Sequence, residues 1–173
     1  RLIHNYTGRC PTLTYEIKRV DGCTVGCQYC LVSDGVHERE LIVHGNYHLY
    51  VRELLERENG AGSSNRNHYY YFSPKTEAFQ EATLIPGIAH RILREFIEHF
   101  RRYPESNARL FVASKAGARH LLYQNEGESI LDLFQQLRSK MQFNTSVSIM
   151  PSALRDIQSK IGRAVQQECR DRS

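Results

Sequence analysis

The sequence predicts an α/β protein with a parallel sheet, because short segments rich in β-branched and aromatic residues alternate with longer amphipathic segments. Among its 173 residues, 40% are hydrophobic and 24% are charged, which is the composition of one ordinary globular domain. The apolar runs are too short to span a bilayer, and no basic start followed by an apolar core marks a signal peptide. We therefore expect a cytoplasmic protein that makes no contact with a membrane.

Three segments form the first part of this pattern. Residues 12–20 alternate between apolar and polar side chains, which predicts a strand. Residues 46–59 have apolar side chains at helical spacing and predict a helix. Residues 69–72, the run YYYF, predict a short buried strand that ends at Ser73-Pro74. The apolar face of the helix consists of Tyr47, Tyr50, Val51, Leu54 and Leu55.

The second part repeats the alternation. Residues 86–103 predict a long helix with an apolar stripe on one face and alternating charges on the other, which is typical of a helix half covered by solvent. Residues 108–115 predict the third strand. Residues 129–141 predict a helix that begins with a capping box formed by Ser129 and Asp132.

A fourth strand is predicted at residues 145–150, so that four βα units follow one another. Four units leave an open sheet edge, which favours a partial (β/α) barrel truncated to about its first four units over a finished small domain. Residues 161–173 resemble the in-frame translation of a sequencing adapter, so we divide the chain into a core of residues 1–160 and a non-native tail. We accordingly expect much of the substrate pocket to lie in a missing part of the protein.

Three of the five cysteines, Cys23, Cys27 and Cys30, stand in one loop directly after the first predicted strand. Closely spaced thiols in a chain without a secretory signal indicate metal binding rather than disulfides. A structural zinc site takes four ligands, and His37 or His44 could complete one. An iron–sulfur cubane also binds thiolates, and three of them would leave one iron open to a substrate or cofactor. The residues alone leave both metals open.

The spacing Cys-x3-Cys-x2-Cys, with Tyr29 just before the last cysteine, resembles the signature of the radical S-adenosylmethionine superfamily. The resemblance implies a 4Fe–4S cluster on Cys23, Cys27 and Cys30, without Cys10, and S-adenosylmethionine as second cofactor. In that superfamily the reduced cluster cleaves this cofactor to a 5′-deoxyadenosyl radical, which abstracts hydrogen from the substrate. A one-electron reductant such as flavodoxin or ferredoxin is then an expected partner.

The resemblance extends over roughly residues 12–156. The stretch SPKTEAFQEATL, residues 73–84, resembles the Thr-Asp/Glu-x-Tyr/Phe-Gln motif of the branch related to spore photoproduct lyase. In the superfamily, the end of this strand receives the amino group of the cofactor. The resemblance therefore implies that Ser73, Thr76 and Glu77 contact that group, with Glu77 as the anion that faces the ammonium.

Further contacts are implied at the next two strands. The stretch VASK at the end of the third strand resembles a Thr-Lys pair of the same branch, which implies that Lys115, with Ser114 beside it, meets the cofactor's carboxylate. An ammonium is a suitable point charge for that group. The end of the fourth strand approaches the ribose in the superfamily, and Ser148 is the candidate here.

Two other functions stay open, and the substrate is unidentified. A zinc-stabilised binding module without catalysis would need a fourth ligand near Cys30. A DNA-repair enzyme like spore photoproduct lyase would need a nucleic-acid track. The net charge of +4 argues neither for nor against nucleic acid, and no basic stripe with interleaved aromatic residues supports it.

Overall fold

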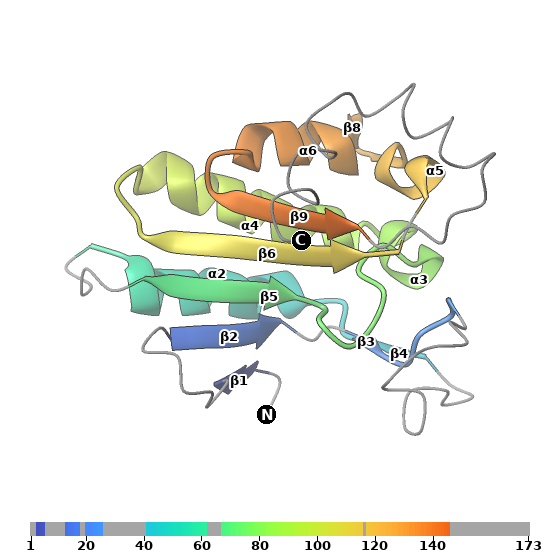
Figure 1. Cartoon of the computed structure of the whole chain (residues 1–173), viewed down its shortest axis with the longest axis horizontal. Coiled ribbons are helices and arrows are strands. Elements are labelled where there is room, and N and C mark those ends of the chain that lie inside the picture. The colour runs from blue at the N-terminus through green and yellow to red at the C-terminus, as the bar shows by residue number, and fades with distance from the viewer. Residues whose placement is uncertain are drawn as a thin grey trace, which may run out of the picture.

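The computed structural model describes residues 3–5, 13–17, 20–25, 41–61, 67–115 and 117–145. Within them a five-stranded sheet has the order β1-β2-β5-β6-β9. Strands β2, β5, β6 and β9 are parallel, and β1 pairs with β2 in the antiparallel direction, as the arrows in Figure 1 show. The predicted α/β class and the parallel sheet are thus confirmed. The strands are β1 (Ile3–Asn5), β2 (Leu13–Ile17), β5 (His68–Phe72), β6 (Ala108–Ser114) and β9 (Met141–Thr145).

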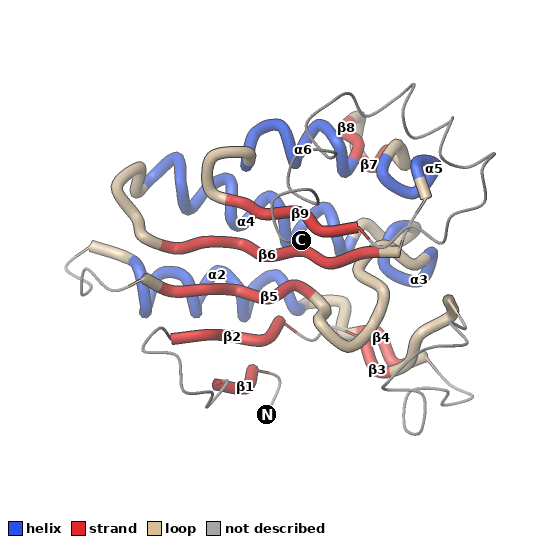
Figure 2. Tube along the Cα trace, in the orientation of Figure 1, coloured by secondary structure: helices blue, strands red, loops and turns tan. Residues whose placement is uncertain are grey.

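A helix connects each parallel strand to the next. These helices are α2 (Tyr47–Asn59), α4 (Ile88–Arg102) and α6 (Ile130–Leu137). Two shorter helices, α3 (Glu81–Leu84) and α5 (Ala118–Leu121), lie in the connections after β5 and β6. Two small ribbons pair β3 (Val20–Asp21) with β4 (Ile42–Val43), and β7 (Gln124–Asn125) with β8 (Glu128–Ser129). Figure 2 shows helices α2 and α4 behind the same face of the sheet.

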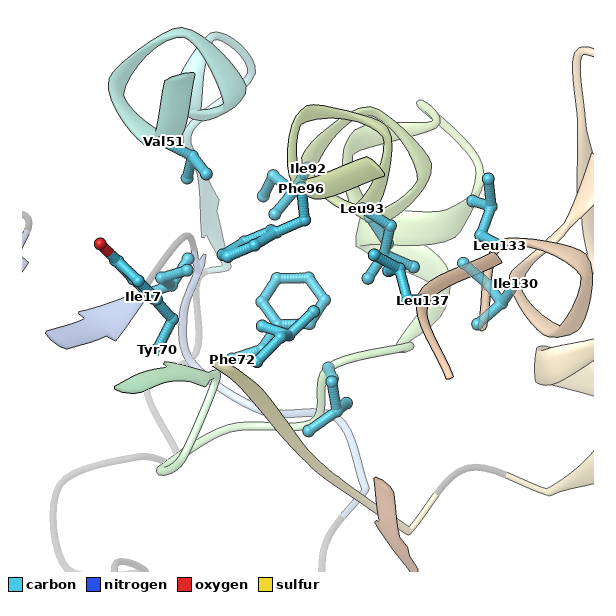
Figure 3. Close-up of a cluster of buried hydrophobic side chains, with 14 of the residues drawn as sticks. Ile17, Val51, Tyr70, Phe72, Ile92, Leu93, Phe96, Ile130, Leu133 and Leu137 are labelled. Carbon is cyan, nitrogen blue, oxygen red and sulfur yellow. The ribbon is translucent and has the colours of Figure 1, made fainter. Parts of the chain in front are cut away.

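The hydrophobic core lies between the sheet and these helices (Figure 3). In β5, Tyr70 and Phe72 are buried whereas Tyr71 between them is 41% exposed. Such alternation is expected when helices cover one face of a sheet, because successive strand side chains point to opposite faces. Phe96 of α4 packs edge-on against Tyr70, with ring centroids 5.5 Å apart. Full burial of one such side chain contributes about 1.5–3 kcal/mol.

The predicted capping box of α6 is confirmed. The Ser129 hydroxyl accepts a hydrogen bond from the Asp132 N–H at 3.1 Å, and the Asp132 carboxylate accepts one from the Ser129 N–H at 2.9 Å. These two bonds satisfy donors that the first turn of a helix otherwise leaves without partners.

The boundary between α6 and the last strand was predicted wrongly. Helix α6 ends at Leu137, and Met141, which the pattern assigned to the helix, begins β9. The Lys140 N–H closes a turn onto the Leu137 carbonyl, and the Lys140 carbonyl already accepts a sheet bond from the Leu110 N–H. Met141 has the spacing of a helical stripe, but sheet pairing decides its conformation. Residues 146–150 of the predicted strand lie outside the described residues.

A second difference concerns Tyr50, which the pattern placed on the apolar face of α2 and which is 45% exposed. Its ring contacts that of the fully buried Tyr47, with centroids 6.3 Å apart. Aromatic side chains can cover apolar surface while the hydroxyl stays in water.

In the described ranges, no helix is both long enough and apolar enough to cross a membrane.

Candidate functional site

The carboxyl ends of β2 and β5 are joined at Ser73, the residue after β5. Its N–H donates a hydrogen bond of 3.0 Å to the carbonyl of Ile17, the last residue of β2. Ser73 is buried and has a φ of +51°, a left-handed conformation that a serine rarely adopts. A backbone of this kind costs on the order of 1–3 kcal/mol and is typical of sites where geometry serves a function.

Glu77 connects the loop after β5 to the end of β6. Its buried carboxylate accepts hydrogen bonds from the Phe79 N–H at 2.9 Å, the Ser114 hydroxyl at 2.6 Å and the Lys115 N–H at 2.7 Å. Bonds to an ionised acceptor are the stronger class of hydrogen bond. Three of the residues predicted to contact a cofactor, Glu77, Ser114 and Lys115, are therefore in direct contact.

The loop that carries Cys23 is held at the same edge by Gln80. The Gln80 side-chain oxygen accepts bonds of 3.1 Å from both the N–H and the hydroxyl of Thr24, and its amide nitrogen lies 3.4 Å from the Gly22 carbonyl. Gln80 is buried and stands at the N-cap of α3, three residues after Glu77. Cys23 has a free, partly exposed thiol. Gln80 thus fixes both residues that flank Cys23, Gly22 and Thr24, to the loop that contains Glu77.

Two buried side-chain oxygens at this edge lack a hydrogen-bond partner within the described part of the chain, Thr76 Oγ1 and Glu16 Oε1. The other Glu16 oxygen lies 3.6 Å from the Lys75 ammonium. Buried polar groups are nearly always hydrogen-bonded, since an unsatisfied one costs about 1–3 kcal/mol. Oxygens of this kind are available to the donors of a ligand.

Cys27, Tyr29, Cys30 and Ser148 lie outside the described residues, as does Cys10. His44, one of the two possible fourth zinc ligands, has its Nε2 atom 3.6 Å from Asp21 Oδ2. No group of three or more potential metal ligands is present among the residues that the structure describes.

Sequence reasoning missed Gln80 and Glu16 as site residues. Gln80 belongs to the motif that carried the resemblance, but its position before a single-turn helix did not indicate that it bonds a loop 56 residues away. In the sequence, Glu16 is one of the polar residues that alternate with apolar ones in the predicted strand. A charged residue one position before the end of a parallel strand is the signal that could have identified it, because ligand sites lie at these ends.

A surface groove of about 450 Å³ lies elsewhere, over α2, α4 and α6. Each of its arginines is paired with a glutamate, so the groove has no excess of positive charge for an anion. The pairs are Arg52–Glu95, Arg94–Glu128, Arg101–Glu98 and Arg102–Glu56. Such a network is typical of a solvated helix surface.

Comparisons of this chain with protein-family models, with curated proteins and with solved structures found no match.

Proposed function

We propose that the chain is part of a radical S-adenosylmethionine enzyme that abstracts hydrogen from an organic substrate. The observation that carries the proposal is the position of Cys23, the one cysteine of the motif among the described residues. Cys23 follows the first parallel strand and is tethered through Thr24 and Gln80 to the loop of Glu77, which in turn bonds Ser114 and Lys115. Glu77, Ser114 and Lys115, three of the residues that the resemblance assigns to cofactor binding, are thus connected to the segment of Cys23, which supports the proposal.

The order of the strands supports a barrel rather than a doubly wound sheet. Each parallel strand pairs with the preceding one, from β2 to β5, β6 and β9, without reversal of the order. A doubly wound sheet reverses its order at a switch point, whereas a (β/α) barrel adds its strands in sequence. We propose that the sheet is the first part of such a barrel, with the helices outside and the face of Tyr71 inside.

The donor set fits an iron–sulfur cluster. The three clustered cysteines offer the soft thiolate ligands that such clusters use, and Cys23 is free and accessible. Cys23, Cys27 and Cys30 would hold it. The chemistry that such a cluster supplies when bound is one-electron cleavage of S-adenosylmethionine.

The residues of the described edge would bind and orient that cofactor. Thr76 offers a buried hydroxyl without a partner among the described residues. A carboxylate has about four acceptor positions, and Glu77 uses three of them for Phe79, Ser114 and Lys115. Among the described residues Oε2 accepts the bond from Lys115, and we propose that its second acceptor position receives the ammonium. We propose that Lys115 meets the carboxylate of the cofactor as a point charge, and its N–H bonds Glu77 at the end of the strand.

The test is anaerobic reconstitution of the chain with iron and sulfide, followed by iron, sulfide and zinc analysis and by incubation with S-adenosylmethionine and a reductant, dithionite or flavodoxin. We expect one oxygen-sensitive 4Fe–4S cluster per chain, lost in Cys27→Ala and kept in the matched control Cys10→Ala. Release of 5′-deoxyadenosine and methionine would complete the support. A colourless protein with one zinc per chain would replace this proposal with the zinc-binding module.

A further inference from the structure

Glu16 is a buried carboxylate that the contacts described so far do not satisfy. It is 8% exposed and lies in β2, one position before the end of the strand. Lys75 approaches Oε2 only to 3.6 Å, and its side chain is 59% exposed, so this ion pair is weak. Oε1 is buried and finds no donor in the described ranges. Keeping a charge in such a place is costly unless something else binds it.

On the side of β5 and β6, the neighbours of Glu16 on the face of the sheet away from the helices are Tyr71 and Phe111. Glu16 is in register with Tyr71 of β5, and Tyr71 is in register with Phe111 of β6. Since neighbouring strands are about 4.8 Å apart and residues in register point to the same face, these side chains stand side by side. The Tyr71 and Phe111 rings are stacked at 5.2 Å with an interplanar angle of 13°. Glu16 therefore stands between this aromatic pair and His4 of β1, the residue in register with it on the other side.

Two further irregularities lie in the loop that supplies Lys75. Ser73 has the left-handed backbone, and the Thr76 hydroxyl is buried without a partner among the described residues. These two features and the Glu16 Oε1 atom all occur at one short stretch of the sheet edge. A loop with a purely structural role avoids such features. Unsatisfied groups and strained backbone that occur together indicate a site built for a ligand.

We propose that Glu16 binds the amino group of a ring-containing amine whose ring lies against Tyr71 and Phe111. The carboxylate supplies the acceptor and the negative charge, and the aromatic pair supplies the apolar surface for the ring. A carboxylate ligand is disfavoured here, because it would face Glu16. The inference rests on the proposed function in that this amine would be the substrate, or part of it. Its binding does not require a cluster.

The test uses the chain without a cluster and three probes, observed by ¹H–¹⁵N chemical shifts. Benzylamine carries both a ring and an ammonium, n-butylamine lacks the ring, and benzoate reverses the charge. We expect benzylamine to bind most tightly, with shifts around residues 16, 71 and 111. Glu16→Gln should weaken it by about tenfold or more, as expected for a bond to a charged group. Glu105→Gln, on an exposed carboxylate before β6, is the matched control.

A second variant and a stability measurement separate binding from structure. Tyr71→Ala should also weaken benzylamine, whereas Tyr50→Ala, at a similarly exposed tyrosine of α2, should not. Because Glu16→Gln removes a poorly satisfied buried charge, its unfolding midpoint should equal or exceed that of the unchanged chain. If the midpoint falls in Glu16→Gln, and by the same amount in Lys75→Ala, then Glu16 is a structural ion-pair partner and the inference is wrong.

It is also wrong if benzylamine does not bind to the unchanged chain, or if it binds equally well to Glu16→Gln. Failure of the cluster to form while benzylamine binds as expected would overturn the proposed function alone. Formation of the cluster with no binding of benzylamine would overturn this inference alone.

Discussion

The hydroxyl of Ser114, the last residue of β6, donates a 2.6 Å hydrogen bond to the carboxylate of Glu77 in the loop after β5. This bond joins two consecutive βα units at the ends of their strands, 37 residues apart in the chain. The same carboxylate holds the N–H of Lys115. Glu77 therefore has a structural role whether or not it also meets a cofactor, and the two roles can be separated by experiment.

Replacing Glu77 with glutamine should destabilise the protein by about 1–3 kcal/mol. The amide NH2 group would then face an N–H or O–H group that donates a hydrogen bond to the carboxylate in the unchanged protein. Chemical denaturation measures the change. Glu81→Gln is the control, since its side chain is 71% exposed and approaches Arg119 only to 3.8 Å. Equal unfolding midpoints for both variants would show that the second carboxylate oxygen and its negative charge contribute nothing to stability.

Replacing Gln80 with alanine should loosen the loop of Cys23, because the N–H and the hydroxyl of Thr24 lose their acceptor. Amide exchange at residues 20–25 and alkylation of Cys23 should both become faster. Gln136→Ala, at an exposed position of α6, should leave both rates unchanged. If the Gln80 variant also keeps the original rates, Gln80 does not hold the loop.

Gly87→Ala should destabilise the protein through two separable effects. Gly87 has a φ of +68°, and an added methyl group would lie 2.5 Å from the side-chain oxygen of Asn125. The left-handed conformation costs about 1–2 kcal/mol for a residue with a Cβ atom. Gly127 also has a positive φ, but a methyl group added there would have no atom within 4 Å. Gly127→Ala therefore measures the conformational part alone. Gly87→Ala should lower the unfolding temperature more than Gly127→Ala does. Adding Asn125→Ala to the Gly87→Ala variant should recover this difference in unfolding temperature.

The stability of the fold should decrease in mild acid because of His90 and His99. Burial is the main cause that lowers the pKa of both residues below the ordinary value of 6.5. The unfolded chain then takes up protons first, so stability is greatest above about pH 6.5 and is lost as the pH falls toward the lowered pKa. The unfolding temperature should drop between about pH 7 and pH 5.

A variant of His99 isolates this effect. His99 Nε2 lies 3.0 Å from the Ser106 hydroxyl, a contact that glutamine can replace. His99→Gln should therefore show a smaller drop in unfolding temperature over the same pH range. His120→Gln, at a half-buried position of α5, serves as the control. An unchanged pH dependence in His99→Gln would rule out His99 as a cause.

The sequence correctly predicted those elements that depend only on residues close together in the chain. The capping box of Ser129 and Asp132 needs only residues three positions apart, and it formed as expected. The strand at Met141 depends on pairing with Leu110, which lies far away in the chain, so local spacing favoured the wrong element. The ribbon of β7 and β8 was likewise missed, although Gly127 at its turn has the left-handed backbone that glycine permits.

The same distinction holds for the site. The motif pointed to Glu77 and Lys115, and the structure brings these two residues into contact. The motif could not indicate that the Glu77 carboxylate already accepts hydrogen bonds from three groups of the chain. Nor could the motif distinguish Glu16, which is buried and whose Oε1 atom has no hydrogen-bond donor among the described residues. Both facts belong to three-dimensional packing.

The uninterrupted strand order has a consequence for how the protein is made. Because each parallel strand pairs with the one synthesised before it, β5 can dock on β2, and β6 on β5, as each leaves the ribosome. Among the described strands, none inserts between two strands that precede it in the chain. The loop closures are therefore short, and less apolar surface is exposed to other nascent chains during translation.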